Sequence, residues 1–141
     1  MYKYRQFGDK FVLSIDNHQP IAATIAEFCK EKNILGGAVY GIGAVNEVTL
    51  RFLDPATLKY VDKTFNEQME IANLTGNISQ KNGQVYLHLH VTLGRRDYTC
   101  VGGHLLEAKI NGACELVVEH FDGPAPGRYQ DSETGLNLYE L

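Results

Sequence analysis

Hydrophobic and polar residues alternate along most of this chain, and that pattern predicts β-strands. The clearest alternation covers residues 84–93, where every second side chain is aliphatic: Leu87, Leu89, Val91 and Leu93. A period of two is typical of a strand with one buried face. Further stretches of this kind, some of them weak, predict strands over residues 2–7, 10–15, 47–54, 58–65, 67–80 and 113–121.

One segment follows the period of a helix instead. Its apolar residues recur four, seven and eight positions after the first: Ile21, Ile25, Phe28 and Cys29. This spacing places them on one face of an α-helix. Asp16 or Asn17 is expected to cap the helix, with Pro20 in its first turn. The helix is expected to end near Asn33.

Two Asn-Gly pairs predict hairpin turns. Asn82-Gly83 is the strongest hairpin signal in the chain, so residues 71–80 and 84–93 are expected to pair antiparallel. Asn111-Gly112 predicts a second hairpin turn, before the strand at residues 113–121. The strand at residues 84–93 should therefore lie inside a sheet.

These elements amount to one helix and seven or eight strands, mostly joined by hairpins. Slippage of the alternation at Asn73 predicts a β-bulge. Residues 122–141 are rich in Gly and Pro and are expected to form a loop tail. The predicted fold is α+β, a strongly bent antiparallel sheet with one main helix packed on it. A chain of 141 residues is expected to form a single domain, residues 1–141.

Composition and charge limit the classes of partner. With 44% hydrophobic and 21% charged residues, the chain has the composition of an ordinary soluble globular protein. No apolar run is long enough for a membrane span, so no membrane partner is expected. The net charge of −4 argues against nucleic-acid binding, which draws its affinity from Lys and Arg. If DNA is bound, Arg95 and Arg96 are the candidate contacts, at the tip of a hairpin.

The cysteines indicate a reducing compartment. Cys29, Cys100 and Cys114 are odd in number and widely spaced, and no C-x-x-C pair occurs. All three are expected to be small buried residues rather than disulfide partners or zinc ligands. The N-terminus lacks the apolar core of a signal peptide, so a cytoplasmic location is expected.

Three histidines are the main candidates for chemistry. His88 and His90 lie on the polar face of the strand at residues 84–93, with Cα atoms roughly 6.5 Å apart. His104 follows Gly102-Gly103, and pairing of its strand with residues 84–93 would bring it to the same face. The alternative is that each is an ordinary surface or hydrogen-bonded histidine. We expect a three-nitrogen site with an open position for zinc or another divalent transition metal.

Other polar residues are weaker candidates for a ligand pocket. Arg51 points away from the apolar face of its strand, so it either pairs with a carboxylate or faces a ligand. Gly43 and Glu70 are further pocket candidates, although the glycines near residue 43 also fit a sharp bend or close packing. His18 is expected at the surface, and His120 partly buried outside the metal site.

Four segments together resemble the PPC (plants and prokaryotes conserved) domain family. They are GIGAVNEVTLRFLD (41–54), MEIANLTGNIS (69–79), HLHVTL (88–93) and VGGHLLEAKINGACELVVEHF (101–121). The combination of HLHV with GGHL is specific, and the resemblance covers nearly the whole chain. Stand-alone prokaryotic members of that family are often labelled DNA-binding, by association with plant AT-hook proteins.

The resemblance implies a compact antiparallel sheet with one main helix, assembled as a homotrimer. It also implies that His88, His90 and His104 form a metal site, with zinc as the ion. Plant members carry an AT-hook, an Arg-Gly-Arg-type segment that this chain lacks. This chain therefore lacks the segment through which plant members contact DNA, so the DNA-binding label has less support here.

Three functions follow as hypotheses. The first is a small trimeric metal-binding protein that recognises an unknown small ligand or protein partner. The second is a metal-dependent hydrolase or lyase, which would need a carboxylate such as Glu70, Glu107 or Glu119 near the metal. The third is a DNA-binding regulator, supported mainly by the family label.

Overall fold

The computed structural model describes residues 1–141 and contains one helix and nine strands. The helix is α1 (Ile21–Glu31). The strands are β1 (Tyr2–Phe7), β2 (Lys10–Ile15), β3 (Gly37–Asp54), β4 (Lys59–Phe65), β5 (Met69–Lys81), β6 (Gln84–Gly94), β7 (Cys100–His120), β8 (Gly127–Gln130) and β9 (Asn137–Glu140). The α+β prediction is confirmed, with more strands than the seven or eight expected. The helix is not long and apolar enough to cross a membrane.

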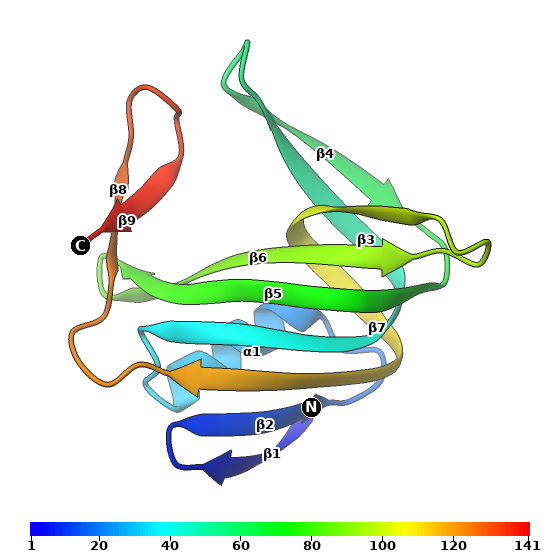
Figure 1. The fold of residues 1–141 in the computed structure, drawn as a ribbon, viewed down its shortest axis with the longest axis horizontal. Coiled ribbons are helices and arrows are strands. Elements are labelled where there is room, and N and C mark those ends of the chain that lie inside the picture. The colour runs from blue at the N-terminus through cyan, green and yellow to red at the C-terminus, as the bar shows by residue number, and fades with distance from the viewer.

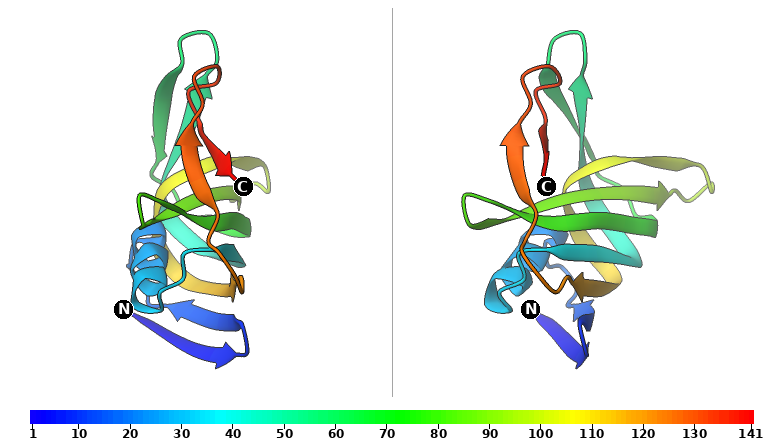
Figure 2. Two further views of the ribbon diagram at one scale, coloured as in Figure 1. Left: turned by 90° about the vertical axis from the view of Figure 1, so that its left-hand side faces the viewer. Right: turned by 60° about the vertical axis from the view of Figure 1, so that its left-hand side comes forward.

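Seven strands form one antiparallel sheet, in the order β1-β2-β7-β6-β5-β3-β4. Strand β7 also pairs with β3, so the pairings β3–β5, β5–β6, β6–β7 and β7–β3 close a circuit. The sheet is therefore strongly bent, as predicted (Figure 1). The β3–β4 hairpin and the separate β8–β9 hairpin both project from the body on the side of β6 (Figures 1 and 2).

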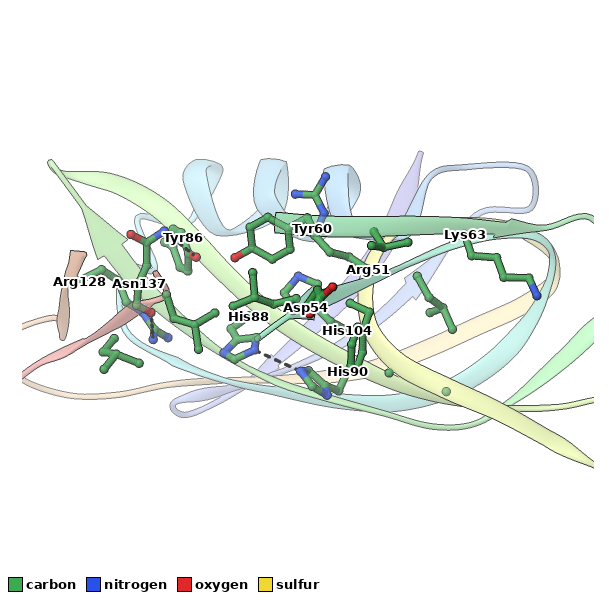
Figure 3. Close-up of a pocket in the computed structure, with 18 of the residues that line it drawn as sticks. Arg51, Asp54, Tyr60, Lys63, Tyr86, His88, His90, His104, Arg128 and Asn137 are labelled. Atoms are coloured by element: carbon green, nitrogen blue, oxygen red, sulfur yellow. Dashed lines mark hydrogen bonds between the residues drawn. The ribbon is translucent and has the colours of Figure 1, made fainter. Parts of the chain in front are cut away.

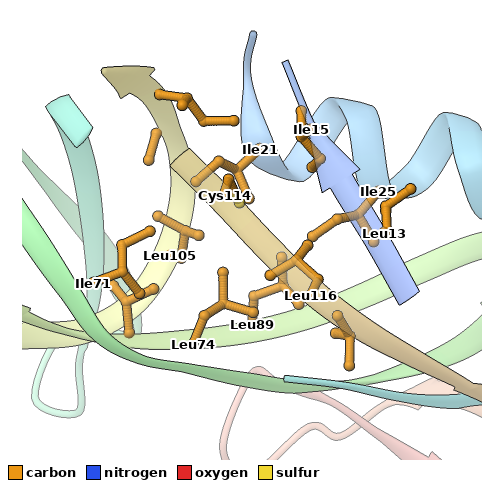
Figure 4. Packing of buried hydrophobic residues seen from close by; sticks show 14 of the residues in the cluster. Leu13, Ile15, Ile21, Ile25, Ile71, Leu74, Leu89, Leu105, Cys114 and Leu116 are labelled. Carbon is orange, nitrogen blue, oxygen red and sulfur yellow. The ribbon is translucent and has the colours of Figure 1, made fainter. Parts of the chain in front are cut away.

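The core lies between the bent sheet and α1. It contains 25 buried residues, and Ile21, Ile25 and Phe28 of the helix are fully buried among them. Aliphatic side chains of several strands meet these residues, as Figure 4 shows for Leu13, Leu89 and Leu116. The apolar face of the helix and the apolar faces of the strands therefore pack together in one core.

The beginning of α1 differs from the prediction. Its N-cap is Pro20, and no side chain from Asp16 or Asn17 caps the helix. The carboxylate of Glu107 on β7 instead accepts hydrogen bonds from the backbone N–H groups of Ala22 (2.8 Å) and Ala23 (3.0 Å). A negative charge at this end also complements the helix dipole. The cap is supplied by a residue 85 positions along the chain, which the local pattern does not reveal.

The two Asn-Gly pairs behave differently. Asn82 and Gly83 both have positive φ angles, 54° and 75°, as a type I′ hairpin turn requires, and β5 pairs with β6 across them. The turn predicted at Asn111-Gly112 is wrong, because β7 continues through both residues. Only Gly112 has a positive φ there, and the Asn111 side chain and carbonyl are both bonded to Gln68.

Several other local predictions can be compared with the structure. The bulge near Asn73 is confirmed by a shift in the β5–β6 register. The strand predicted from residue 47 begins ten residues earlier, at Gly37, and Gly41 and Gly43 pack closely against the β7 backbone. The tail at residues 122–141 is not all loop, because it contains the β8–β9 hairpin.

The prediction of three buried cysteines is wrong for one of them. Cys29 and Cys114 are buried, whereas Cys100 is exposed at the start of β7. All three are free thiols, as expected.

Candidate metal centre

The β6–β7 pairing brings the three predicted ligands to one face of the sheet. His88 and His90 are two residues apart on β6, on the face opposite the buried Leu89. The β6–β7 register places His104 directly across from His90. Gly103, next to His104, has a φ of 150°, a conformation that other residues rarely adopt. A glycine before the third histidine is thus required by the backbone at this point.

The imidazole rings are close enough to share an ion. One ligand nitrogen from each ring lies within 4.8 Å of the others, and Nε2 of His88 is 3.2 Å from Nε2 of His90. Ring centroids are separated by 5.1–5.5 Å (Figure 3). Ligand nitrogens at about 2.0–2.1 Å from a tetrahedral zinc ion lie about 3.3 Å apart, which is close to the 3.2 Å between the nitrogens of His88 and His90.

The surroundings of His88 and His104 favour the neutral form of their rings, which is the form that binds metal. Burial lowers the pKa of His104 to about 4, with smaller contributions from His88, His90 and Arg51. Burial also lowers the pKa of His88, as do the charges of His90 and Arg128. Both imidazoles are therefore unprotonated at neutral pH and have lone pairs for an ion.

A cavity of about 910 Å³ opens beside the three histidines. Its walls come from the β3–β4 hairpin, from β6 and β7, and from the C-terminal β8–β9 segment (Figure 3). Apolar side chains such as Phe52, Phe65 and Leu138 make up much of the lining. The cluster thus faces a partly open cavity large enough for a small molecule.

Comparison with known proteins identifies the family. Residues 2–122 match the Plants and Prokaryotes Conserved domain, abbreviated PCC here and PPC above. The chain belongs to this family. None of the curated proteins compared with the PCC chain matches it.

Solved structures similar to the PCC chain share the whole fold. A candidate DNA-binding protein from Bacteroides thetaiotaomicron is 54% identical, with a TM-score of 0.96, and 99% of this chain and 97% of that chain are covered. A metal-containing protein from Archaeoglobus fulgidus is 35% identical, with a TM-score of 0.89 over 100% of this chain and 99% of that one. A plant- and prokaryote-conserved protein from Pyrococcus horikoshii is 24% identical, with a TM-score of 0.87 over 100% and 95% of the two chains.

The predicted pocket residues of the PCC chain are divided between two places. Arg51 lines the cavity beside His104, its register partner across β3 and β7. Its guanidinium donates two hydrogen bonds of 2.8 Å to the Asp62 carboxylate, so it has a carboxylate partner already. Gly43 and Glu70 line a smaller hollow of about 460 Å³, which contains none of the three histidines.

The residues predicted to contact DNA lie at the far end of β6. Arg95 forms an ion pair of 2.7 Å with Glu67, which offsets its charge. Arg96 is exposed in the turn between β6 and β7. The two arginines therefore provide one unpaired cation at this turn.

The carboxylates considered as partners for a metal are also accounted for. Glu107 caps α1, and Glu70 lies in the smaller hollow. Glu119 lies 3.5 Å from Lys10 at the other end of the sheet. The carboxylate that lines the histidine cavity is Asp54, which also accepts a hydrogen bond from Ala56 N in the β3–β4 turn.

Tyr86 and Arg128 are among the cavity residues that the sequence interpretation missed. Tyr86 carried a signal, because it alternates onto the same face of β6 as His88. Arg128 carried none, since it lies in the Gly- and Pro-rich tail and reaches the cavity only through the folding of β8.

Proposed function

We propose that this protein is a metal-binding protein that holds a divalent transition metal on His88, His90 and His104 and recognises a small ligand in the adjoining cavity. The observation that carries the proposal is the convergence of three imidazole nitrogens within 4.8 Å at the wall of a 910 Å³ cavity. Three protein ligands leave at least one coordination position for a ligand atom from the cavity.

Zinc is the metal we propose. Three neutral imidazoles suit zinc and other late first-row ions, whereas calcium and magnesium prefer oxygen ligands. The lowered pKa values of His88 and His104 support this choice, because the nitrogens need no deprotonation at neutral pH. The metal-containing relative from Archaeoglobus fulgidus, at 35% identity over the full chain, supports metal binding in general.

We further propose that the protein works as a homotrimer, as the family resemblance implies, and that it works in the cytoplasm. Large apolar side chains are exposed on the body and on the β3–β4 hairpin, among them Ile42 (57%), Phe52 (67%) and Val61 (58%). Burial of such groups between subunits would stabilise an assembly. Light scattering after size exclusion should then give about three times the chain mass of 15.7 kDa.

The metal content of purified protein tests the proposal. Wild-type protein is stripped with a chelator, reloaded with zinc, desalted and analysed by plasma mass spectrometry. We expect one zinc per chain. The double variant His88→Ala, His104→Ala should retain none, because a single imidazole cannot hold the ion against desalting.

A third variant serves as the matched control. His120→Ala removes a partly buried histidine of β7 that lies outside the cluster. It should bind one zinc per chain, like the wild type. Full zinc retention by the double variant would rule out the proposed site.

Two other functions remain as alternatives. The name of the Bacteroides thetaiotaomicron relative favours DNA binding, and a salt-dependent affinity for duplex DNA would support it. The net charge of −4 and the Arg95–Glu67 ion pair make it the weaker proposal. A hydrolase or lyase would use the same metal to polarise its substrate, with Asp54 as a carboxylate in the cavity wall.

A further inference from the structure

The charged residues of the histidine cavity are mostly cationic. Arg51, Lys63 and Arg128 line it together with the carboxylate of Asp54, and the charge of Arg51 is offset by its ion pair with Asp62. The chain as a whole has a net charge of −4, so this local excess runs against the overall balance. A bound divalent metal would add two more positive charges. The cavity therefore favours an anion.

Arg128 is the most unusual of the three cations. It is only 9% exposed, yet it forms no ion pair with any carboxylate. Its hydrogen-bond acceptors are all neutral: Ser79 Oγ (2.8 Å), Asn77 Oδ1 (2.6 Å) and the Asn137 carbonyl (3.1 Å). Its guanidinium also packs against two tyrosine rings, 5.1 Å from the centroid of Tyr86 and 4.0 Å from that of Tyr139.

A buried charge without a counter-charge is costly to a fold. The neutral acceptors orient the guanidinium but do not balance it. They also occupy only three of its five N–H groups, which leaves one N–H on each terminal nitrogen for a further acceptor. An anion in the cavity would supply both the missing charge and the missing acceptors.

Arg128 is held next to the histidine cluster. Asn77, which accepts its Nη2 hydrogen bond, pairs directly with His88 in the β5–β6 register. Tyr86, under the guanidinium, lies two residues before His88 on the same face of β6, roughly 6.5 Å away along the strand. Figure 3 shows Arg128, Tyr86 and His88 along one side of the cavity.

We propose that the cavity binds a small organic carboxylate with an apolar body, and that Arg128 holds its carboxylate. The planar fork of arginine matches a carboxylate, and the apolar body would lie against the side chains of Phe52, Tyr60 and Phe65. The inference rests on the proposed function in that the ligand's other polar atoms would face the metal. The role of Arg128 does not itself require the ion.

Calorimetry with a matched pair of probes tests this inference. Phenylacetate and its neutral isostere phenylacetamide are titrated into full-length protein, both zinc-loaded and metal-free. We expect phenylacetate to bind at least about tenfold more tightly than phenylacetamide in both forms, because only the acid forms a charge-assisted bond to Arg128. Equal affinities for the two probes, or no measurable binding of phenylacetate, would overturn the inference.

Variants assign the effect to Arg128. Arg128→Gln should lose the preference for the acid while its zinc content stays at the wild-type value. Arg128→Lys keeps the charge without the fork and should retain part of the preference. Arg5→Gln, an exposed arginine of β1 away from the cavity, controls for net charge and should bind both probes like the wild type. A full preference for the acid in folded Arg128→Gln would contradict the assignment.

The two proposals fail separately. Protein that takes up no zinc, but binds phenylacetate through Arg128, removes the metal site and leaves this inference standing. Protein that binds one zinc per chain without preferring the acid removes the inference and leaves the metal site. Inorganic phosphate is the competing anion, and phosphate binding tighter than that of phenylacetate would overturn the carboxylate assignment. Because the acid and amide arms use wild-type protein, the inference is tested even if Arg128→Gln does not fold.

Discussion

The capping of α1 by Glu107 predicts a measurable loss of stability when that carboxylate is removed. Glu107 is partly buried on β7 and accepts hydrogen bonds from Ala22 N at 2.8 Å and Ala23 N at 3.0 Å. These N–H groups belong to the first turn of the helix and have no partner within it. Replacing Glu107 with Ala therefore leaves these two helix donors without their acceptor, and it also removes the acceptor of the 2.9 Å hydrogen bond from Ala108 N.

The size of the effect follows from these contacts. Loss of an N-terminal cap costs about 0.5–2 kcal/mol, and loss of the charge at the helix dipole adds about 0.3–1 kcal/mol. The Ala23 N–H is exposed and can bond to water, so the lower half of the combined range applies. We expect Glu107→Ala to reduce the free energy of unfolding by about 1.5 kcal/mol. Glu107→Gln keeps one acceptor oxygen and should lose about 1 kcal/mol.

Urea denaturation followed by circular dichroism measures both variants. The matched control is Glu115→Ala, an exposed glutamate on the same strand whose side chain forms no ion pair or hydrogen bond. It should change the free energy of unfolding by less than about 0.5 kcal/mol. If Glu107→Ala is no less stable than Glu115→Ala, the carboxylate does not cap the helix and the reasoning fails.

Two further predictions concern buried thiols and a close backbone contact. Burial raises the pKa values of Cys29 and Cys114 to about 12. At about pH 9, iodoacetamide should therefore modify Cys100 alone in native protein, and all three thiols in urea. Rapid modification of more than one native thiol, measured by mass spectrometry, would contradict this. A Cβ atom on Gly76 would lie 2.2 Å from a carbonyl oxygen of β6, so Gly76→Ala should destabilise the fold by more than about 3 kcal/mol in urea titrations, whereas Gly94→Ala, with no atom nearer than 3.8 Å, should be tolerated.

Much of the fold was predictable because its determinants are local. The alternation at residues 84–93 and the turn at Asn82-Gly83 fixed one hairpin, since each depends on neighbouring residues only. The predictions failed where distant contacts override local signals. Asn111-Gly112 is held inside β7 by Gln68, and α1 is capped by Glu107 rather than by the residues before it.

The candidate site also combines residues whose positions follow from local sequence with residues whose positions depend on distant contacts. His88 and His90 share a face because of their spacing on one strand, and the glycine pair before His104 pointed to the third member. Arg128 could not be predicted, because its place depends on how the C-terminal segment folds back over β5 and β6. No local pattern in residues 122–141 predicts that contact.

The most direct test of the metal centre is an anomalous-scattering map from crystals of zinc-loaded protein, collected at the zinc absorption edge. Our account predicts one strong peak per chain, bonded to nitrogens of His88, His90 and His104 at about 2.0–2.1 Å and open towards the cavity. A fully zinc-loaded crystal with no peak between these three rings would contradict it.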